Sequence, residues 1–184
     1  MVTVPLTRVT SRPISPRRSM HSRSNRRLDG DRFRRQRCSR SGGREQIAPA
    51  IRHWLARFDG DRRVRSEWER ALAAPAWEGP PVWHHGDFDV RNWLVRNGRI
   101  SAVIDWGSMG VGDPACEVMV AWELHAAVGR DAFRAALRVD DATWDRARGW
   151  VVSQAVAALA YYTPENNPSL YNEAQSWLEL VLSE

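Results

Sequence analysis

The stretch "HHGDFDVRNWLVRNGRISAVIDWGSMGVGDPACE", residues 84–117, contains the strongest turn signal of the chain. Asn97 and Gly98 stand between two apolar runs. This dipeptide favours a two-residue turn in which both central residues adopt positive φ. The sequence therefore predicts an antiparallel hairpin on either side of Asn97 and Gly98.

The register of this hairpin follows from counting outward from the turn. The expected cross-strand pairs are Arg96 with Arg99, Leu94 with Ser101, Asn92 with Val103, and Asp105 with Val90. This register gathers Asp87, Asn92 and Asp105 at the open end of one hairpin.

The two carboxylates and the amide at this end suit a particular chemistry. Magnesium prefers hard oxygen ligands and usually binds through one or two carboxylates plus substrate phosphates, a role that fits Asn92 and Asp105. Asp87 would then accept a proton from a substrate hydroxyl while the metal neutralises phosphate charge. The arrangement favours phosphoryl transfer.

Two other interpretations of the same stretch stay open. His84, His85, Asp87 and Asp89 could form a transition-metal site, although adjacent histidines on a strand point to opposite faces. Alternatively, Asp87, Asp89 and Asp105 are turn and capping residues, and His85 is a hydrogen-bonded residue of the core.

The rest of the folded body is predicted to be mostly helical. Apolar residues at helical spacing predict one helix over 47–58 and a second around 68–72. Asp113 is expected to cap a helix that begins at Pro114. The remaining predicted helices are a short one over 130–139, one over 142–162 capped by Asp141, and one from Ser169 to near the C-terminus.

Charge divides the chain into a tail and a body. Residues 1–43 carry twelve Arg and two Asp, whereas residues 44–184 carry fifteen Arg and twenty acidic residues. The Arg/Ser/Pro-rich tail has few large apolar residues and is predicted to be disordered. It could bind nucleic acid or another polyanion, but a solvated tail is the favoured interpretation, so a nucleic-acid partner is not expected.

Three further features of the sequence limit the functions and locations that we expect. No apolar run approaches the roughly 20 residues of a membrane-spanning helix, and the Arg-rich N-terminus lacks a signal-peptide core. We therefore expect a cytoplasmic protein with no membrane partner. Cys38 and Cys116 are expected to be two free thiols. All 27 Lys+Arg residues are Arg, which excludes any mechanism that needs an ammonium group.

The segments "HHGDFDVRNWLV" and "VIDWGSMGVGDPACEV" together resemble the signature of the aminoglycoside phosphotransferase family. The resemblance covers about residues 44–184. It implies an α+β, mostly α-helical fold: the C-terminal lobe of a protein-kinase-like fold, with a β-hairpin that carries the catalytic loop. It also implies ATP as co-substrate, Mg²⁺ as cofactor, and a hydroxyl of an aminoglycoside or another small metabolite as acceptor.

The resemblance implies roles for individual residues. Asp87 matches the catalytic base, and Asn92 and Asp105 match the positions that hold the metal ions. His85 and Gly86 match the two residues that shape the loop before the base.

The chain also departs from the family pattern. Asp113 matches the aspartate of the family's "GDPA" element, but Glu117 stands where an aspartate is usual. Where the family often has His-Pro-Gly between the base and the amide, this chain has Asp89, Val90 and Arg91.

The family's N-terminal lobe, with its phosphate-binding lysine, is expected to be missing. A C-terminal lobe alone is expected to be weakly active or inactive, because phosphoryl transfer depends on positioning and charge stabilisation. It would also expose an apolar face, which predicts self-association or a separate N-terminal lobe as partner. The alternatives are an inactive family fragment and a polyanion-binding protein. The acceptor substrate is not specified by the sequence.

Overall fold

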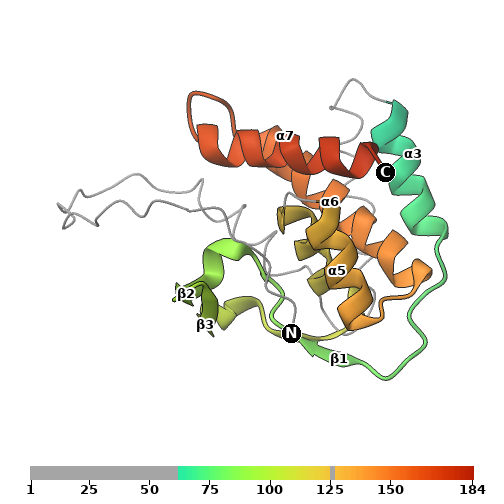
Figure 1. Ribbon diagram of the computed structural model, residues 1–184. Helices are drawn as coiled ribbons and strands as arrows, with labels where there is room; N and C mark the ends of the chain where they lie inside the picture. Colours follow the sequence, from blue (N-terminus) through green and yellow to red (C-terminus); the bar gives the residue numbers. More distant parts are fainter. Residues whose placement is uncertain (1–61, 125–126) are drawn as a thin grey trace.

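The computed structural model describes residues 62–124 and 127–184 (Figure 1). This part of the chain is a mixed α/β structure, mostly helical, with two small antiparallel sheets. The tail predicted over 1–43 and the helix predicted over 47–58 lie outside the described residues. No helix in the described ranges has the length and apolar character needed to cross a bilayer.

The strands lie between residues 82 and 112, and the described elements after them are all helical. The α-helices are α3 (Arg62–Ala73), α4 (Ala115–Val118), α5 (Ala127–Leu137), α6 (Asp141–Tyr161) and α7 (Pro168–Leu182). The 3₁₀ helices are η1 (Val90–Asn92), η2 (Trp106–Ser108) and η3 (Met119–Leu124). The strands are β1 (Val82–His84), β2 (Trp93–Arg96), β3 (Arg99–Val103) and β4 (Gly110–Gly112).

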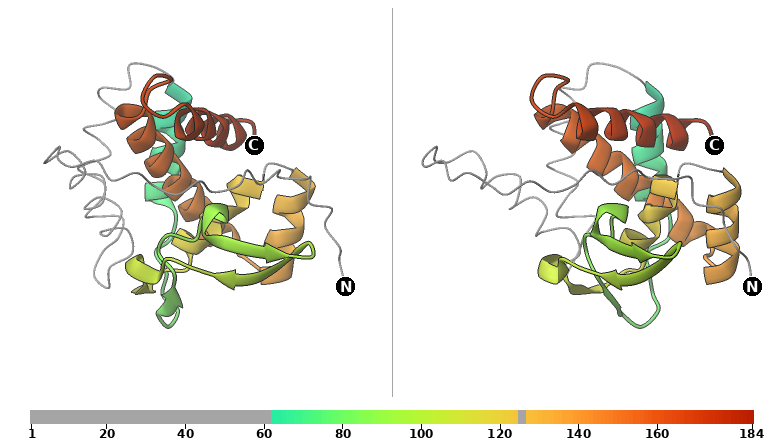
Figure 2. Two further views of the ribbon diagram at one scale, coloured as in Figure 1. Left: turned by 90° about the vertical axis from the view of Figure 1, so that its left-hand side faces the viewer. Right: turned by 60° about the vertical axis from the view of Figure 1, so that its left-hand side comes forward.

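Helix α6 is the centre of the core. Most of its residues between 143 and 156 are buried, and it packs against α3, α4 and α7. A helix that is buried on nearly all sides needs apolar or satisfied side chains around its whole circumference. Gly149 permits the close approach of α3, because a Cβ there would lie 2.4 Å from the Ala71 Cβ. In both views of Figure 2, α3 and α7 lie in the upper part of the picture and the hairpin of β2 and β3 lies in the lower part.

The caps of α6 and α7 differ from those predicted. Asp140 Oδ1 accepts the Thr143 N–H at 2.7 Å, so Asp140 caps α6 and the prediction of Asp141 was wrong by one residue. Asn167 Oδ1 accepts the Leu170 N–H at 3.2 Å and caps α7 in place of Ser169. In each case the observed cap precedes the predicted one, and at α7 Pro168 takes the first helical position, where no N–H is needed.

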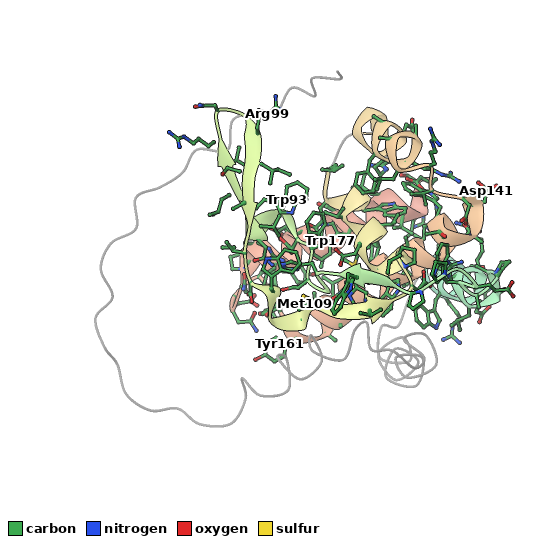
Figure 3. All side chains as sticks on the ribbon, turned by 90° about the horizontal axis from the view of Figure 1, so that it is seen from below. Trp93, Arg99, Met109, Asp141, Tyr161 and Trp177 are labelled. Atoms are coloured by element: carbon green, nitrogen blue, oxygen red, sulfur yellow. The ribbon has the colours of Figure 1, made fainter. Side chains whose placement is uncertain are left out.

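The predicted turn of the β2–β3 hairpin is confirmed. Asn97 and Gly98 have φ of 54° and 73°, and Arg96 pairs with Arg99. Figure 3 shows Arg99 at the outer end of the hairpin and Trp93 near its inner end. Apolar side chains on its surface are about half exposed, among them Leu94, Val95 and Ile100.

Beyond the turn, the predicted register was wrong by one residue. Ser101 is an extra residue in β3, so Leu94 pairs with Ala102 and Trp93 with Val103. The Ser101 hydroxyl donates to the Leu94 carbonyl at 2.9 Å, which stabilises this bulge. The three incorrect pairs were Leu94 with Ser101, Asn92 with Val103, and Asp105 with Val90. Asn92 lies instead beside Ile104, whose N–H donates to the Asn92 carbonyl at 2.9 Å.

The second sheet joins the two motifs of the quoted stretch. In it, β1 pairs antiparallel with β4, and His84 lies opposite Gly110. The loop after β1 is therefore held next to the segment after Asp105. Cys116, buried at the start of α4, is disulfide-bonded, so the prediction of a free thiol was wrong for Cys116. Cys38 lies outside the described residues.

Candidate active site

Gly86 sets the course of the loop that leads to Asp87. Its φ is +79°, a backbone angle that residues other than glycine rarely adopt. A Cβ there would lie 2.1 Å from the Ser108 carbonyl oxygen. The loop after β1 thus packs directly on the backbone of η2. A side chain at position 86 would separate the two segments.

His85 connects the same two segments through its ring. Its Nδ1 accepts the Asp87 N–H at 3.3 Å, and its Nε2–H donates to the Ile104 carbonyl at 2.9 Å. The ring is buried and lies 4.6 Å from the Trp106 ring, centre to centre. One imidazole therefore fixes the positions of Asp87 and of the backbone just before Asp105.

Asn92 is held by the backbone of Asp87. The Asn92 amide nitrogen donates to the Asp87 carbonyl at 2.8 Å, and the same carbonyl accepts the Asp89 N–H at 2.9 Å. Because the amide nitrogen is a donor only, the amide oxygen is the atom with which Asn92 could hold a metal ion. Asp87 itself is partly buried.

Asp105 lies at the end of the hairpin in an unusual backbone conformation. Its φ of 64° and ψ of 56° are left-handed, and it makes no side-chain capping bond to η2. Asp tolerates this region better than bulky or β-branched residues, but the conformation still costs of order 1 kcal/mol. The carboxylate is solvent-exposed, so it is accessible to a ligand.

Asp113 lies farther along and is bonded within the protein. Its Oδ1 accepts the Ala115 N–H at 2.9 Å, but α4 begins at Ala115 with Pro114 as its N-cap, so the cap predicted at Asp113 was wrong by one residue. Its Oδ2 accepts from Arg146 Nε at 2.7 Å, and Arg146 is buried in α6. Asp113 thereby attaches the segment after the candidate site to the helical core.

Two glutamates that sequence reasoning did not place in the site hold its loop. Glu117 Oε1 accepts the Gly86 N–H, and Glu123 Oε2 accepts the Val90 N–H, both at 2.9 Å. Glu117 was noted in the sequence as a change from aspartate. Glu123 follows Glu117 by six residues, from α4 into the 3₁₀ helix η3, and both glutamates contact the same loop.

Glu123 is in a strongly perturbed environment. Its side chain is 6% exposed, and burial raises its pKa to about 8, with repulsion from Asp89 adding to the effect. The Val90 N–H and Arg91 act in the opposite direction. The carboxyl group is therefore protonated in a large share of molecules at neutral pH.

Asp89 and Arg91 form a local pair beside Glu123. Asp89 Oδ1 accepts both the Arg91 backbone N–H and its Nε–H at 2.8 Å, and Asp89 Oδ2 accepts from Nη2. These bonds raise the pKa of Arg91 above its usual value. Arg91 Nη1 also lies 3.4 Å from a Glu173 oxygen, which links the loop to α7.

The structure opposes a transition-metal site at His84, His85, Asp87 and Asp89. Both ring nitrogens of His85 are already hydrogen-bonded. Among the described residues, the group of possible ligands that lies close together is His84, Cys116 and Glu117, within 4.8 Å of one another. Cys116 is disulfide-bonded and thus does not offer a thiolate.

Comparison with known proteins gave one match. The family model described as the phosphotransferase enzyme family matches residues 6–150, well over half of the chain. Neither the curated proteins nor the solved structures include a significant match. The matched range contains every candidate site residue named above on the loops and the hairpin. It begins within the predicted tail and ends within α6, so the predicted boundary at residue 43 stays a prediction.

Proposed function

Because the chain belongs to the phosphotransferase enzyme family, we propose that it transfers the γ-phosphoryl group of ATP to a hydroxyl of a small molecule with the help of Mg²⁺. Family membership agrees with the resemblance noted from the sequence. The nucleotide, the metal ion, the acceptor and the site residues are the parts that we add.

The observation that carries this proposal is the shared anchoring of the two motifs. The Asp87 carbonyl holds the Asn92 amide, and the Asn92 carbonyl accepts the N–H of Ile104, the residue before Asp105. The carbonyl of the same Ile104 accepts the Nε2–H of His85. The Asp87 backbone, the Asn92 side chain and the residue before Asp105 are thus linked by one network of hydrogen bonds, which supports the roles that we propose for these three residues.

The donor set fits magnesium. The Asn92 amide oxygen and the Asp105 carboxylate are hard oxygen ligands, and magnesium commonly uses one or two such groups together with substrate phosphates. We assign these two residues to the metal. When bound, the ion supplies charge neutralisation on the phosphate oxygens.

Asp87 is assigned to the acceptor hydroxyl. It orients the hydroxyl and takes its proton while the hydroxyl oxygen bonds to the γ-phosphorus and the bond from phosphorus to the ADP oxygen breaks. The proton then passes from Asp87 to solvent. The protein's contribution is positioning, which the bonds from His85, Glu117 and Glu123 to this loop supply.

A second candidate function is nucleotide binding without transfer. The observation that favours it is that all 27 Lys+Arg residues are Arg, so the given sequence supplies no lysine for contact with the phosphates. Arginine also binds phosphate but with a different, planar geometry. The two candidates differ in turnover and share nucleotide binding.

The test is ADP release by the full chain with Mg·ATP and a panel of small hydroxyl compounds that includes aminoglycosides. We expect weak, acceptor-dependent turnover that falls about 10²-fold to 10⁴-fold in Asp87→Asn. Asp131→Asn, at an exposed position of α5, is the matched control and should keep wild-type turnover. Binding of Mg·ATP without any turnover would favour the second candidate, and turnover that survives Asp87→Asn would remove Asp87 from its role.

A further inference from the structure

Two carboxylates from one helical segment hold the loop on both sides of Asp87. Glu117 lies in α4 and Glu123 in η3, and their partners are the backbone N–H groups of Gly86 and Val90. We propose that Glu123 is a positioning residue that fixes the loop from Asp87 to Asn92 through the Val90 N–H. The inference rests on the proposed function only in calling this loop catalytic.

The Val90 N–H needs an outside partner. Val90 is the first residue of η1, and the first N–H groups of a helix have no acceptor within the helix. Glu123 accepts this one at 2.9 Å, while the Asp89 side chain accepts the Arg91 N–H at 2.8 Å. The Asn92 N–H donates to the Asp89 carbonyl, also at 2.8 Å. Three consecutive N–H groups before β2 are therefore fixed, and among their acceptors in the described part of the chain Glu123 alone lies outside the loop.

This anchor depends on a residue at which the chain departs from the family pattern. Where the family often has proline, Val90 supplies an N–H. Proline would fit the local backbone, because Asp89 is extended with φ −109° and ψ 144° and Val90 is the first helical position. Val90→Pro therefore removes the donor while the backbone course is preserved.

The charged groups around Glu123 explain what its side chain must provide. Asp89 on the loop and Glu173 on α7 face it with like charge, and Arg91 faces it with opposite charge. Burial first, and then the charges of Asp89 and Glu173, raise the pKa of Glu123 to about 8 against the opposing effects of Arg91 and the Val90 N–H, so an acceptor oxygen matters more than a negative charge at neutral pH. Glutamine offers the same acceptor oxygen. Glu123→Gln should keep the anchor, and Glu123→Ala should lose it.

The experiment is a double-mutant cycle on the full chain, read by amide hydrogen exchange of residues 86–93 without ligand. Glu123→Ala and Val90→Pro should each speed exchange of the remaining amides in this segment about tenfold, the loss expected for one buried hydrogen bond. The double variant should exchange no faster than either single variant. Glu123→Gln should exchange within about twofold of wild type, and amides of α6 should be unchanged in all variants.

Each outcome decides the proposal separately from the proposed function. Additive effects, unchanged exchange in Val90→Pro, or a Glu123→Gln variant as fast as Glu123→Ala would overturn it. If Glu123→Ala does not fold, Val90→Pro and Glu123→Gln carry the comparison. Where turnover is measurable, loosening the loop should lower kcat with little change in KM for ATP, a split that general destabilisation would not give. If the effects of the two mutations are not additive but the chain does not bind Mg·ATP, the role of Glu123 in holding the loop stands and the proposed function is rejected.

Discussion

At the scale of single residues, the candidate site is defined by groups that fix backbone atoms near Asp87. His85, Glu117 and Glu123 each bond to an N–H of the loop, and each of the three is buried or partly buried. Such bonds are strong in a poorly solvated setting and costly to leave unmade. Small changes at these positions should therefore have local and measurable effects.

Gly86→Ala tests the contact of the loop with η2. The new Cβ would meet the Ser108 carbonyl at 2.1 Å in a backbone with positive φ, so we expect a loss of about 2–4 kcal/mol in unfolding free energy, measured in urea. Gly98→Ala is the matched control, because Gly98 also has positive φ but has nothing within 4 Å of its Cβ position. It should lose only about 1 kcal/mol. Equal losses would show that contact with Ser108 is unimportant.

The raised pKa of Glu123 predicts a pH dependence of stability. Its pKa is about 8 in the folded protein and near 4.5 when unfolded, so between these values the folded state binds more protons. Stability contributed by this group is full below the unfolded pKa and is lost as pH rises towards the folded pKa.

Thermal unfolding at pH 5.5 and pH 8 tests whether stability falls as the pH rises. Both pH values are chosen from the range between the unfolded and the folded pKa of Glu123. The midpoint of the wild-type chain should fall more between these values than that of Glu123→Gln, which cannot titrate. The difference between the two proteins isolates Glu123 from other titrating groups. An identical fall in both would contradict the raised pKa.

At the scale of elements, local signals predicted the turn but not the register. Asn97 and Gly98 specify a turn because both must adopt positive φ, and this requirement is local. The extra residue Ser101 depends on how β2 and β3 pair, which the strand sequence does not express. The same limit applies at the start of α6, where Asp140 and Asp141 are both good caps by residue type.

In the candidate site, too, some residues could be predicted from the sequence and others could not. Asp87, Asn92 and Asp105 belong to two short motifs, so their roles could be predicted from sequence, although those roles stay predictions. Glu123 contacts the loop from 33 residues away, and no pattern within the loop indicates it. Its contact exists because the fold brings both η3 and α4 against this loop.

A pair of neighbouring aspartates tests the assignment of the α6 cap. Asp140→Ala removes the acceptor of the Thr143 N–H, a bond that also lowers the pKa of Asp140, and should cost about 1 kcal/mol of unfolding free energy in urea. Asp141→Ala removes a carboxylate that is 98% exposed and should cost less than about 0.5 kcal/mol. A larger loss for Asp141→Ala would restore the cap predicted from sequence.

At the scale of the whole molecule, buried arginines connect the helices. Arg148 on α6 is 4% exposed and donates to Glu67 on α3, to Glu184 after α7, and to the Val181 carbonyl on α7. A buried charge is tolerated only when it is paired and hydrogen-bonded. Arg148 satisfies this condition and ties three helices together.

Arg148→Met should be strongly destabilising because it leaves two partly buried carboxylates without this partner. We expect a loss of about 3–5 kcal/mol in unfolding free energy measured in urea. Arg70→Met is the matched control, since Arg70 binds the same Glu67 oxygen from an exposed position and should contribute about 0–1 kcal/mol. Similar losses in the two variants would argue against a special role for the buried network.

The central claim is that Asn92 and Asp105 hold a magnesium ion with the phosphates of ATP. Calorimetric titration of the full chain with ATP, with and without Mg²⁺, tests it most directly, using Asp105→Ala and the exposed control Asp131→Asn. Thermal unfolding of each sample establishes that it is folded. We predict magnesium-dependent binding in the wild-type chain and in Asp131→Asn, and its loss in Asp105→Ala. Binding of equal affinity in folded Asp105→Ala, or no binding in the folded wild-type chain, would contradict the claim.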